Sequence, residues 1–382
     1  MKYCTKCWLP STKPDLSFDK YGVCSACTAF ENRIEVDWSM RSKEFTSIMS
    51  RNLRNSNSNW DCIIPVSGGK DSTYQVIKIL ELGYKPLCVT ATTCDLTEIG
   101  RRNIENIKNL GVDYVEVSPN PITRKKLNNI ALRTVGDISW PEHVGIFTIP
   151  VRAAVEYQIP MIIWGENSQN EYGGPVPAQV ASVLNRRWLE EFGGLNGLRV
   201  GDLSDSFGIS NRDLIPYTYP SDEELARVGV TGVFLGQYFP WDGVSNYLIS
   251  QAHGFESFGY PIEGSMVNYE NLDNYQAGIH DYFKYLKYGF GRATDLVSNH
   301  IRRGRLTRSE GLAIIISRDG MYPKSYLNKP LEEILSKIEM SLSEFDGICD
   351  QFTNREIFET APNGVLVKDN SGRPIKRLSQ NA

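Results

Sequence analysis

The sequence predicts an α/β protein built on a doubly wound parallel sheet, with a small metal-binding module at its N-terminus and a helical C-terminal region. Three observations support this prediction. Four cysteines near the N-terminus are spaced as two pairs, short β-branched runs alternate with helical patterns through the middle of the chain, and a glycine pair follows the first of these runs. Strands that alternate with helices of about 10 to 15 residues are typical of parallel sheets.

The periodicity of apolar residues places the individual elements. Strands are expected at 63–66, 85–93, 113–117, 160–167 and 232–239. Helices are expected at 36–55, 74–82, 96–110, 122–135, 140–156 with a break near Pro150, 178–192, 271–288, 293–303, 307–316 and 331–345. We therefore predict an N-terminal module at 1–35, a sheet domain at 56–245 with an insertion at about 168–230, and a mainly helical region at 246–382.

The stretch between the first strand and its helix has the composition of a phosphate-binding loop, Ser67-Gly68-Gly69-Lys70-Asp71-Ser72. Two glycines let backbone N–H groups approach a phosphate, and the helix that follows points its positive end at the same place. Lys70 adds a cation and Asp71 can hold Mg²⁺, while the two serines supply hydroxyls. The spacing is not that of a Walker A loop. A Gly-Gly turn with a capping Ser or Asp is the competing interpretation.

Two other strand ends should lie at the same edge of the sheet, where ligands of such sheets bind. Ala91 and Thr92 end the second strand and could offer backbone groups to an adenine. Gly165, Glu166 and Asn167 follow the strand at 160–167 and are candidates for Mg²⁺ or ribose contacts. An ordinary strand end would explain Ala91 and Thr92 equally well, and simple loop capping is the alternative for Glu166 and Asn167.

The composition of the chain indicates which binding partners and which cellular compartment to expect. A formal net charge of −4 argues against a nucleic-acid partner, because no overall basic field is present. The N-terminus lacks the apolar segment of a secretory signal, and no stretch approaches the roughly 18 apolar residues of a membrane span. We therefore expect a cytoplasmic protein without membrane contact.

The paired cysteines are Cys4 and Cys7, followed by Cys24 and Cys27. Four thiolates in two C-x-x-C pairs can close a tetrahedron around Zn²⁺ and leave no open position, which predicts a structural site. A redox C-x-x-C is the main rival, but it normally lies in a βαβ setting that is missing here.

Further motifs connect the chain with a known family. The Ser67–Ser72 loop resembles the SGGxDS loop of the PP-loop ATP pyrophosphatases, which have a HUP-like sheet, bind the whole triphosphate and transfer AMP. With the remaining motifs, the chain resembles the N-acetyl sugar amidotransferases of the WbpG/PseA type, enzymes of bacterial O-antigen, lipopolysaccharide and pseudaminic acid pathways. These motifs are the cysteine ribbon, Trp164–Asn167, Tyr238–Asp242, Lys287–Asp295 and Ile301–Arg308.

The resemblance implies that ATP and ammonia convert an N-acetyl group of a nucleotide-linked or acidic sugar into an acetamidino group. The amide oxygen attacks the α-phosphorus, pyrophosphate leaves, and ammonia then displaces AMP. Lys70 and Asp71 are the implied catalytic residues. The implied triphosphate and Mg²⁺ residues are Ser67, Gly68, Gly69, Lys70, Asp71 and Ser72. Arg292, Asp295 and Arg302 are implied contacts of substrate or pyrophosphate, although an arginine-rich segment is often only a solvated surface.

The source of ammonia follows from the remaining cysteines, Cys62, Cys88, Cys94 and Cys349. A built-in glutaminase needs a reactive cysteine beside a base, and none of these has one in sequence. The histidines at 143, 253, 280 and 300 are scattered, and we assign none of them a metal. The resemblance implies a separate glutaminase and a cyclase-like barrel subunit that pass ammonia to this chain through a channel.

Two other functions compete with this hypothesis. A zinc-ribbon PP-loop enzyme that thiolates tRNA would need paired catalytic cysteines and a basic surface, and the sequence offers neither in an obvious form. A catalytically silent scaffold that only holds a nucleotide or a partner is the second alternative. No residue identifies the sugar.

Overall fold

The computed structural model describes residues 1–33, 35–54, 58–167 and 195–377, and the helix expected at 178–192 lies outside them. A parallel five-stranded sheet forms the centre, in the order β3-β2-β1-β4-β5. Its strands are β1 (Cys62–Pro65), β2 (Pro86–Ala91), β3 (Asp113–Val117), β4 (Met161–Trp164) and β5 (Thr231–Phe234). The chain runs outward from β1 to β3 and then crosses to β4, so the strand order reverses between β1 and β4. Ligands of open α/β sheets bind beyond the carboxyl ends of the strands at such a point.

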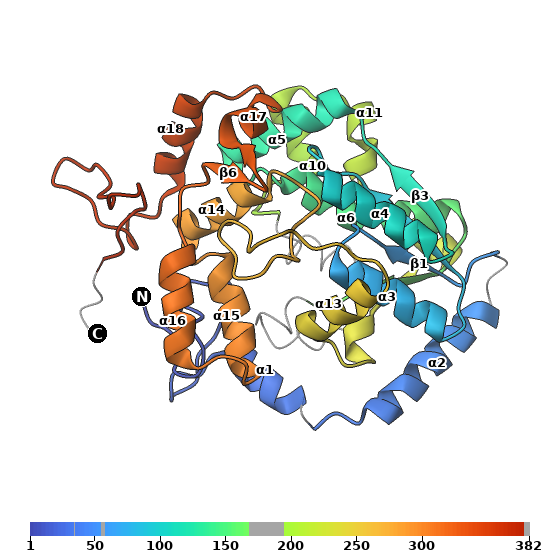
Figure 1. Ribbon diagram of the computed structural model, residues 1–382. Helices are drawn as coiled ribbons and strands as arrows, with labels where there is room; N and C mark the ends of the chain where they lie inside the picture. The colour runs from blue at the N-terminus through green and yellow to red at the C-terminus, as the bar shows by residue number, and fades with distance from the viewer. Residues whose placement is uncertain (34, 55–57, 168–194, 378–382) are drawn as a thin grey trace.

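Helices cover both faces of the sheet, which confirms the doubly wound α/β fold (Figure 1). On one face Cys62 and Ile64 pack with apolar residues of α2 (Trp38–Arg54), α3 (Lys70–Glu81) and α4 (Glu98–Asn109). On the other face Ile63 packs with α6 (Trp140–Glu156). Successive residues of a strand point to opposite faces, so the apolar run of β1 serves both layers.

The helix α6 continues through Pro150, where the sequence suggested a break. A proline inside a helix removes one backbone hydrogen bond. Here the helix is buried along β1, β2 and β4, and this packing offsets the loss. The helix before it, α5 (Pro121–Val135), begins at a proline in its first turn, a position that tolerates proline.

The segment from 195 to 230, which belongs to the predicted insertion, contains short helices. They are α10 (Val200–Phe207), α11 (Asn211–Leu214) and α12 (Asp222–Val228), with a short 3₁₀ turn at Ile215–Tyr217. Ser210 and Ser221 cap two of them through their side chains. Both serines therefore satisfy free N–H groups in the first turn of the helix that they precede.

The C-terminal region is helical, as expected. It contains α13 (Gly243–Ala252), α14 (Ala277–Tyr288), α15 (Arg292–Arg302), α16 (Arg308–Arg318), α17 (Leu331–Ser336) and α18 (Leu342–Phe352), with a small hairpin of β6 (Ser325–Tyr326) and β7 (Lys329–Pro330). The single helix expected at 331–345 is two helices. The chain reverses at Glu339, whose φ of +54° is incompatible with a continuous helix.

The N-terminal module and residues 373–376 lie beside the same two helices, α15 and α16 (Figure 1). The N-terminal module, which ends in α1 (Ser25–Arg33), packs against α15 and α16 through Trp8, whose N–H groups donate to Ser298 and Arg308. Residues 358–376 form a narrow arm of paired extended segments. No helix in the described ranges combines the length and apolarity needed to cross a lipid bilayer.

Candidate active site

The Ser67–Ser72 loop connects β1 to the first turn of α3, which begins at Lys70. Gly68 has a φ of +85°, and a Cβ at this position would lie 3.1 Å from the backbone nitrogen of Ile104 and 3.2 Å from the carbonyl oxygen of Gly100. A side chain would therefore meet both positive-φ strain and the backbone of α4. The glycine therefore lets the loop pass close to α4 before α3 begins, and the N-terminal N–H groups of α3 are at the ligand edge of the sheet.

Lys70 lies between carboxylates. Its Nζ is 2.5 Å from Asp71 Oδ2 and 3.1 Å from Glu270 Oε1, and its side chain is only 6% exposed. Burial alone would lower the pKa of Lys70, but the charges of Asp71 and Glu270 outweigh it and hold the pKa well above its usual value. Lys70 is therefore a permanent cation that can move from these carboxylates to a phosphate.

Asp71 and Lys70 are also held by α13. Asn246 Nδ2 donates to Asp71 Oδ1 at 2.8 Å, and Ser250 Oγ donates to the Lys70 carbonyl oxygen at 2.6 Å. Ser72 Oγ donates to the Gly69 carbonyl oxygen at 3.0 Å. Because α13 fixes the first turn of α3, one oxygen of Asp71 is oriented by an amide while the other contacts Lys70.

A small cavity opens beside Lys70 and is lined by segments that are distant in sequence. The end of β4 contributes Glu166, whose Oε2 accepts a 2.9 Å hydrogen bond from the Trp241 indole N–H. The C-terminal region contributes Tyr269, Glu270, and the α15 residues Leu296, Asn299 and His300, followed by Arg303 and Arg305. The cavity is therefore shared between the sheet domain and the C-terminal region.

Asp242 carries the second charge cluster of this cavity. Its carboxylate accepts from Arg305 at 2.5 Å and lies 3.3 Å from Arg303 Nε. Burial would raise the pKa of Asp242, but Arg305 and Arg303 hold it far below its usual value. The predicted segment Tyr238–Asp242 thus supplies Trp241 and Asp242 to the site.

The remaining residues predicted for ATP lie at the same sheet edge. Thr92 follows β2, and Arg124 Nη1 donates to its carbonyl oxygen and to its Oγ1 at 2.5 and 2.9 Å. Ala91 is the last residue of β2. Gly165 follows β4, where a Cβ would lie 3.1 Å from the Trp241 ring, and Asn167 is buried. Parallel strands bring all three segments together.

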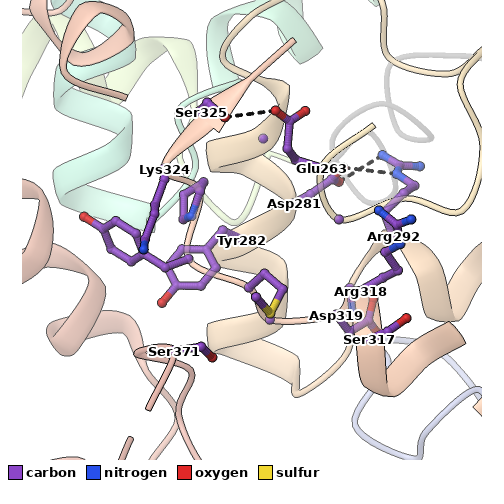
Figure 2. A pocket seen from close by; sticks show the side chains of 17 residues that line it. Glu263, Asp281, Tyr282, Arg292, Ser317, Arg318, Asp319, Lys324, Ser325 and Ser371 are labelled. Atoms are coloured by element: carbon purple, nitrogen blue, oxygen red, sulfur yellow. Dashed lines mark hydrogen bonds and ion pairs between the residues drawn. The ribbon is translucent and has the colours of Figure 1, made fainter. Parts of the chain in front are cut away.

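The three residues predicted for substrate or pyrophosphate lie elsewhere. Arg292 pairs with Asp281 at 3.1 Å and lines another cavity of the C-terminal region, together with Arg318 and Lys324 (Figure 2). Asp295 is buried and pairs with Lys284. Arg302 contacts Cys7 Sγ at 3.8 Å. Of the three, Arg292 interacts with the charge of Glu270, and their role as ligand contacts stays a prediction.

The four N-terminal cysteines form a cluster with the dimensions of a zinc site. The Cys4 and Cys27 sulfurs are 3.8 Å apart, those of Cys7 and Cys24 are 3.7 Å apart, and all four side chains are buried. With Zn–S bonds of about 2.3 Å, tetrahedral thiolates lie about 3.8 Å apart. The cysteines therefore fit Zn²⁺ with four protein ligands, which is a structural site.

The described residues include a polar cluster that sequence reasoning missed. It joins His143 and His280, two of the histidines left without a metal, to Asp137. His280 Nδ1 is 2.8 Å from Asp137 Oδ1, and His143 Nδ1 is 3.5 Å from Oδ2. No local motif predicts it, because His280 comes from α14 and the other two from the start of α6 and the turn before it.

Glu142 is a second residue at the ligand edge of the sheet that the sequence did not identify as a candidate. Gly145, one turn further along α6, faces Ala91 at the end of β2, so the first turn of α6 lies beyond the carboxyl end of the sheet. Glu142 accepts hydrogen bonds from Cys94 N and Asn128 Nδ2. Burial raises its pKa to about 7, although Arg124 opposes this shift. Glu142 can therefore exchange a proton near neutral pH.

The cysteines outside the ribbon are not activated. Burial raises the pKa of Cys94 to about 11, with a further contribution from Glu142, and it raises the pKa of Cys62, Cys88 and Cys349 as well. Thiolates are the nucleophilic form. None of these thiols is thus prepared to act as a nucleophile at neutral pH.

Comparisons with solved structures give low-scoring similarities. An NMN synthetase from Francisella tularensis matches with a TM-score of 0.29 and 16% identity, over 51% of this chain and 92% of that chain. A predicted subunit of a tRNA methyltransferase from Methanocaldococcus jannaschii matches with 0.29 and 14%, over 60% and 88%. An NH3-dependent NAD synthetase from Campylobacter jejuni matches with 0.30 and 11%, over 57% and 97%. We draw no conclusion from scores of this size.

The sequence comparisons concern the C-terminal region. No curated protein matches the chain. Residues 256–369 match the family described as "LPS biosynthesis protein WbpG-like, C-terminal domain". This segment includes Tyr269, Glu270 and the helix α15, which line the Lys70 cavity. The resemblance to the WbpG type is thus confirmed for this part of the chain, and we call residues 256–369, which match that family model, the WbpG-like domain.

Proposed function

We propose that this protein is an ATP-dependent amidotransferase that converts an N-acetyl group of a bacterial surface-glycan sugar into an acetamidino group. The observation that carries the proposal is the pairing of Lys70, in the Ser67–Ser72 loop, with Glu270 of the WbpG-like domain. A loop suited to a triphosphate and a domain of a polysaccharide-biosynthesis family therefore meet at one cation.

The chemistry needs a site that positions reactants and stabilises charge. An amide oxygen is a poor leaving group, so it first attacks the α-phosphorus of ATP, and pyrophosphate leaves. Ammonia then adds to the imidate carbon, and AMP departs with the former amide oxygen. No enzyme nucleophile is needed, which agrees with the raised thiol pKa values of the cysteines outside the ribbon.

The residues of the loop have separate roles in this proposal. Lys70 moves from Asp71 and Glu270 to the phosphates and stabilises the charge that develops at the α-phosphorus. Asp71, oriented by Asn246, would hold Mg²⁺ together with phosphate oxygens, and Mg²⁺ would neutralise triphosphate charge. The N–H groups at the start of α3 bind phosphate oxygens.

We further propose that ammonia comes from a partner glutaminase through a cyclase-like subunit. The support is that burial raises the pKa of every thiol outside the ribbon, so that none of these cysteines is prepared to serve as the nucleophile of a glutaminase. If the purified chain used glutamine as fast as ammonium without any partner, this part of the proposal would be wrong.

The test is incubation with ATP, Mg²⁺ and ammonium against a panel of N-acetylated nucleotide sugars and nonulosonic acids. The expected products are AMP and a sugar whose mass has changed by the exchange of oxygen for NH. Formation of ADP would exclude attack at the α-phosphorus. Binding of RNA at moderate salt, with no sugar product, would instead support a tRNA-modifying enzyme.

A further inference from the structure

We infer that Asp137, His143 and His280 form a second metal site, which binds a divalent transition metal of the Zn²⁺ class. We call these three side chains the His-Asp cluster. They are separate from the cysteine ribbon and from the Lys70 cavity, and the inference does not depend on the proposed function.

The ligand atoms are already gathered. One ring nitrogen of each histidine and one carboxylate oxygen all lie within 4.8 Å of one another. The two imidazoles approach different oxygens of the same carboxylate, at 2.8 and 3.5 Å, and their rings are nearly perpendicular with centroids 5.0 Å apart. With metal–ligand bonds of about 2.0 to 2.1 Å, tetrahedral N and O ligands lie about 3.4 Å apart, so small side-chain rotations complete the site.

The carboxylate is oriented from outside the cluster. Asp137 Oδ1 also accepts a 2.9 Å bond from the Ser139 N–H, and Oδ2 accepts from Asn196 Nδ2 at 3.3 Å. Partners of this kind fix the direction of a metal-binding carboxylate. Its backbone is fixed as well, because Gly136, in the left-handed conformation, faces the Phe352 ring so closely that a Cβ would lie 2.8 Å from it.

The buried carboxylate of Asp137 and the partly exposed histidine rings both suit a bound metal ion. The Asp137 side chain is 3% exposed, and a buried carboxylate requires a nearby cation. The His143 and His280 side chains are 25% and 27% exposed, so a route from solvent to their rings exists. A dication would compensate the buried charge without requiring protonated imidazoles.

The donor set selects the kind of metal. Two imidazole nitrogens and one carboxylate oxygen suit Zn²⁺, Co²⁺, Ni²⁺ or Fe²⁺, whereas Mg²⁺ and Ca²⁺ prefer oxygen ligands only. Zn²⁺ held by three side chains keeps a fourth position for water or another ligand. The site would also join the WbpG-like domain, through His280 of α14, to the sheet domain, through α6.

The experiment measures metal content and cobalt spectra of the full-length protein. After incubation with ZnCl₂ and removal of free metal, wild type should hold two equivalents per chain, and His280→Ala should hold one. His253→Ala is the matched control, because His253 is exposed and bonds only its own helix through the Ile249 carbonyl. It should keep both equivalents.

Cobalt distinguishes the two sites when stoichiometry is ambiguous. Co²⁺ in the ribbon should give intense thiolate charge-transfer absorption, and Co²⁺ in the His-Asp cluster only weak d–d bands. His280→Ala should remove the weak bands and retain the thiolate absorption, and His143→Ala should do the same. If wild type binds metal only in the thiolate site, and both variants have its spectrum and stoichiometry, the cluster is an ion pair and the inference is wrong.

Discussion

At the residue scale, Lys70 holds together segments that meet only in the folded chain. Its partners are Asp71 in the loop and Glu270 in the WbpG-like domain. Lys70→Met should lower the rate of ATP-to-AMP turnover by about 100-fold or more, because removing a preorganised charge-stabilising group from a site has effects of this size. The measurement is AMP release with ammonium and an accepted sugar.

Lys78→Met is the matched control for this substitution. Lys78 lies two turns further along α3, with its Nζ 3.1 Å from Glu81, and should tolerate the change without loss of activity. Equal rates for Lys70→Met and wild type would show that the loop does not act on phosphate, and would support a silent scaffold.

Glu142 gives a pH dependence whose sign follows from its burial. Its pKa is raised from 4.5 to about 7, so the folded state binds a proton that the unfolded state releases. Its contribution to stability is therefore complete below pH 4.5 and is lost as the pH rises through about 7. The Glu142→Gln variant has no carboxyl group to ionise at this position. The free energy of unfolding of wild type should therefore fall relative to that of the variant, by up to about 3 kcal/mol, as the pH rises from 5 to 8.

Urea unfolding at a series of pH values measures this difference. Glu223→Gln, an exposed residue of α12, should leave the pH profile parallel to that of wild type. A parallel profile for Glu142→Gln as well would mean that Glu142 is ionised in the folded protein throughout this range.

At the element scale, α15 connects the cysteine ribbon to the Lys70 cavity. Ser298 and Arg302 contact the ribbon, at Trp8 and Cys7, while Asn299 and His300 line the cavity. Removal of zinc by a chelator should therefore lower the melting temperature and raise the KM for ATP on the order of tenfold, a usual size for coupling between two sites. Titration of ATP before and after chelation checks this.

The Trp8→Ala variant tests the packing of the ribbon on α15 and α16 separately from metal binding by the ribbon. Trp8 stacks on Arg308, with the guanidinium carbon 3.7 Å from the ring centroid, and its N–H groups bond α15 and α16. The variant should keep its zinc and still show the higher KM. An unchanged KM in both zinc-free protein and Trp8→Ala would mean that the ribbon only stabilises its own fold.

At the scale of the whole molecule, the sheet domain and the C-terminal region share one hydrophobic core. Ile99, Leu132 and Ile138 of the sheet domain pack in a cluster with C-terminal residues such as Phe283 and Phe345. A fragment of residues 1–255 should therefore expose this apolar surface and aggregate, whereas the full chain keeps the surface covered. Light scattering and calorimetry test this. A monomeric fragment with cooperative unfolding would show that the sheet domain folds independently.

Local patterns were sufficient to predict the sheet and the loop. The β-branched run at 63–66, the glycines before Lys70 and the paired cysteines are each determined within a few residues. Contacts between residues that are far apart in the sequence could not be predicted from local patterns. Glu270 carries no motif that assigns it to Lys70, and His280 has no sequence relation to Asp137, because both pairs form only when α13, α14 and α15 pack on the sheet domain.

The position of the cysteine ribbon has a consequence for synthesis of the chain. Residues 4–27 are made well before their docking surface on α15 and α16, which is complete only after residue 318. The ribbon must therefore persist beside the ribosome without its neighbours, and a small segment with few apolar residues would achieve this by binding metal. Zinc supply during translation, rather than after it, should then decide how much of the chain reaches its native structure.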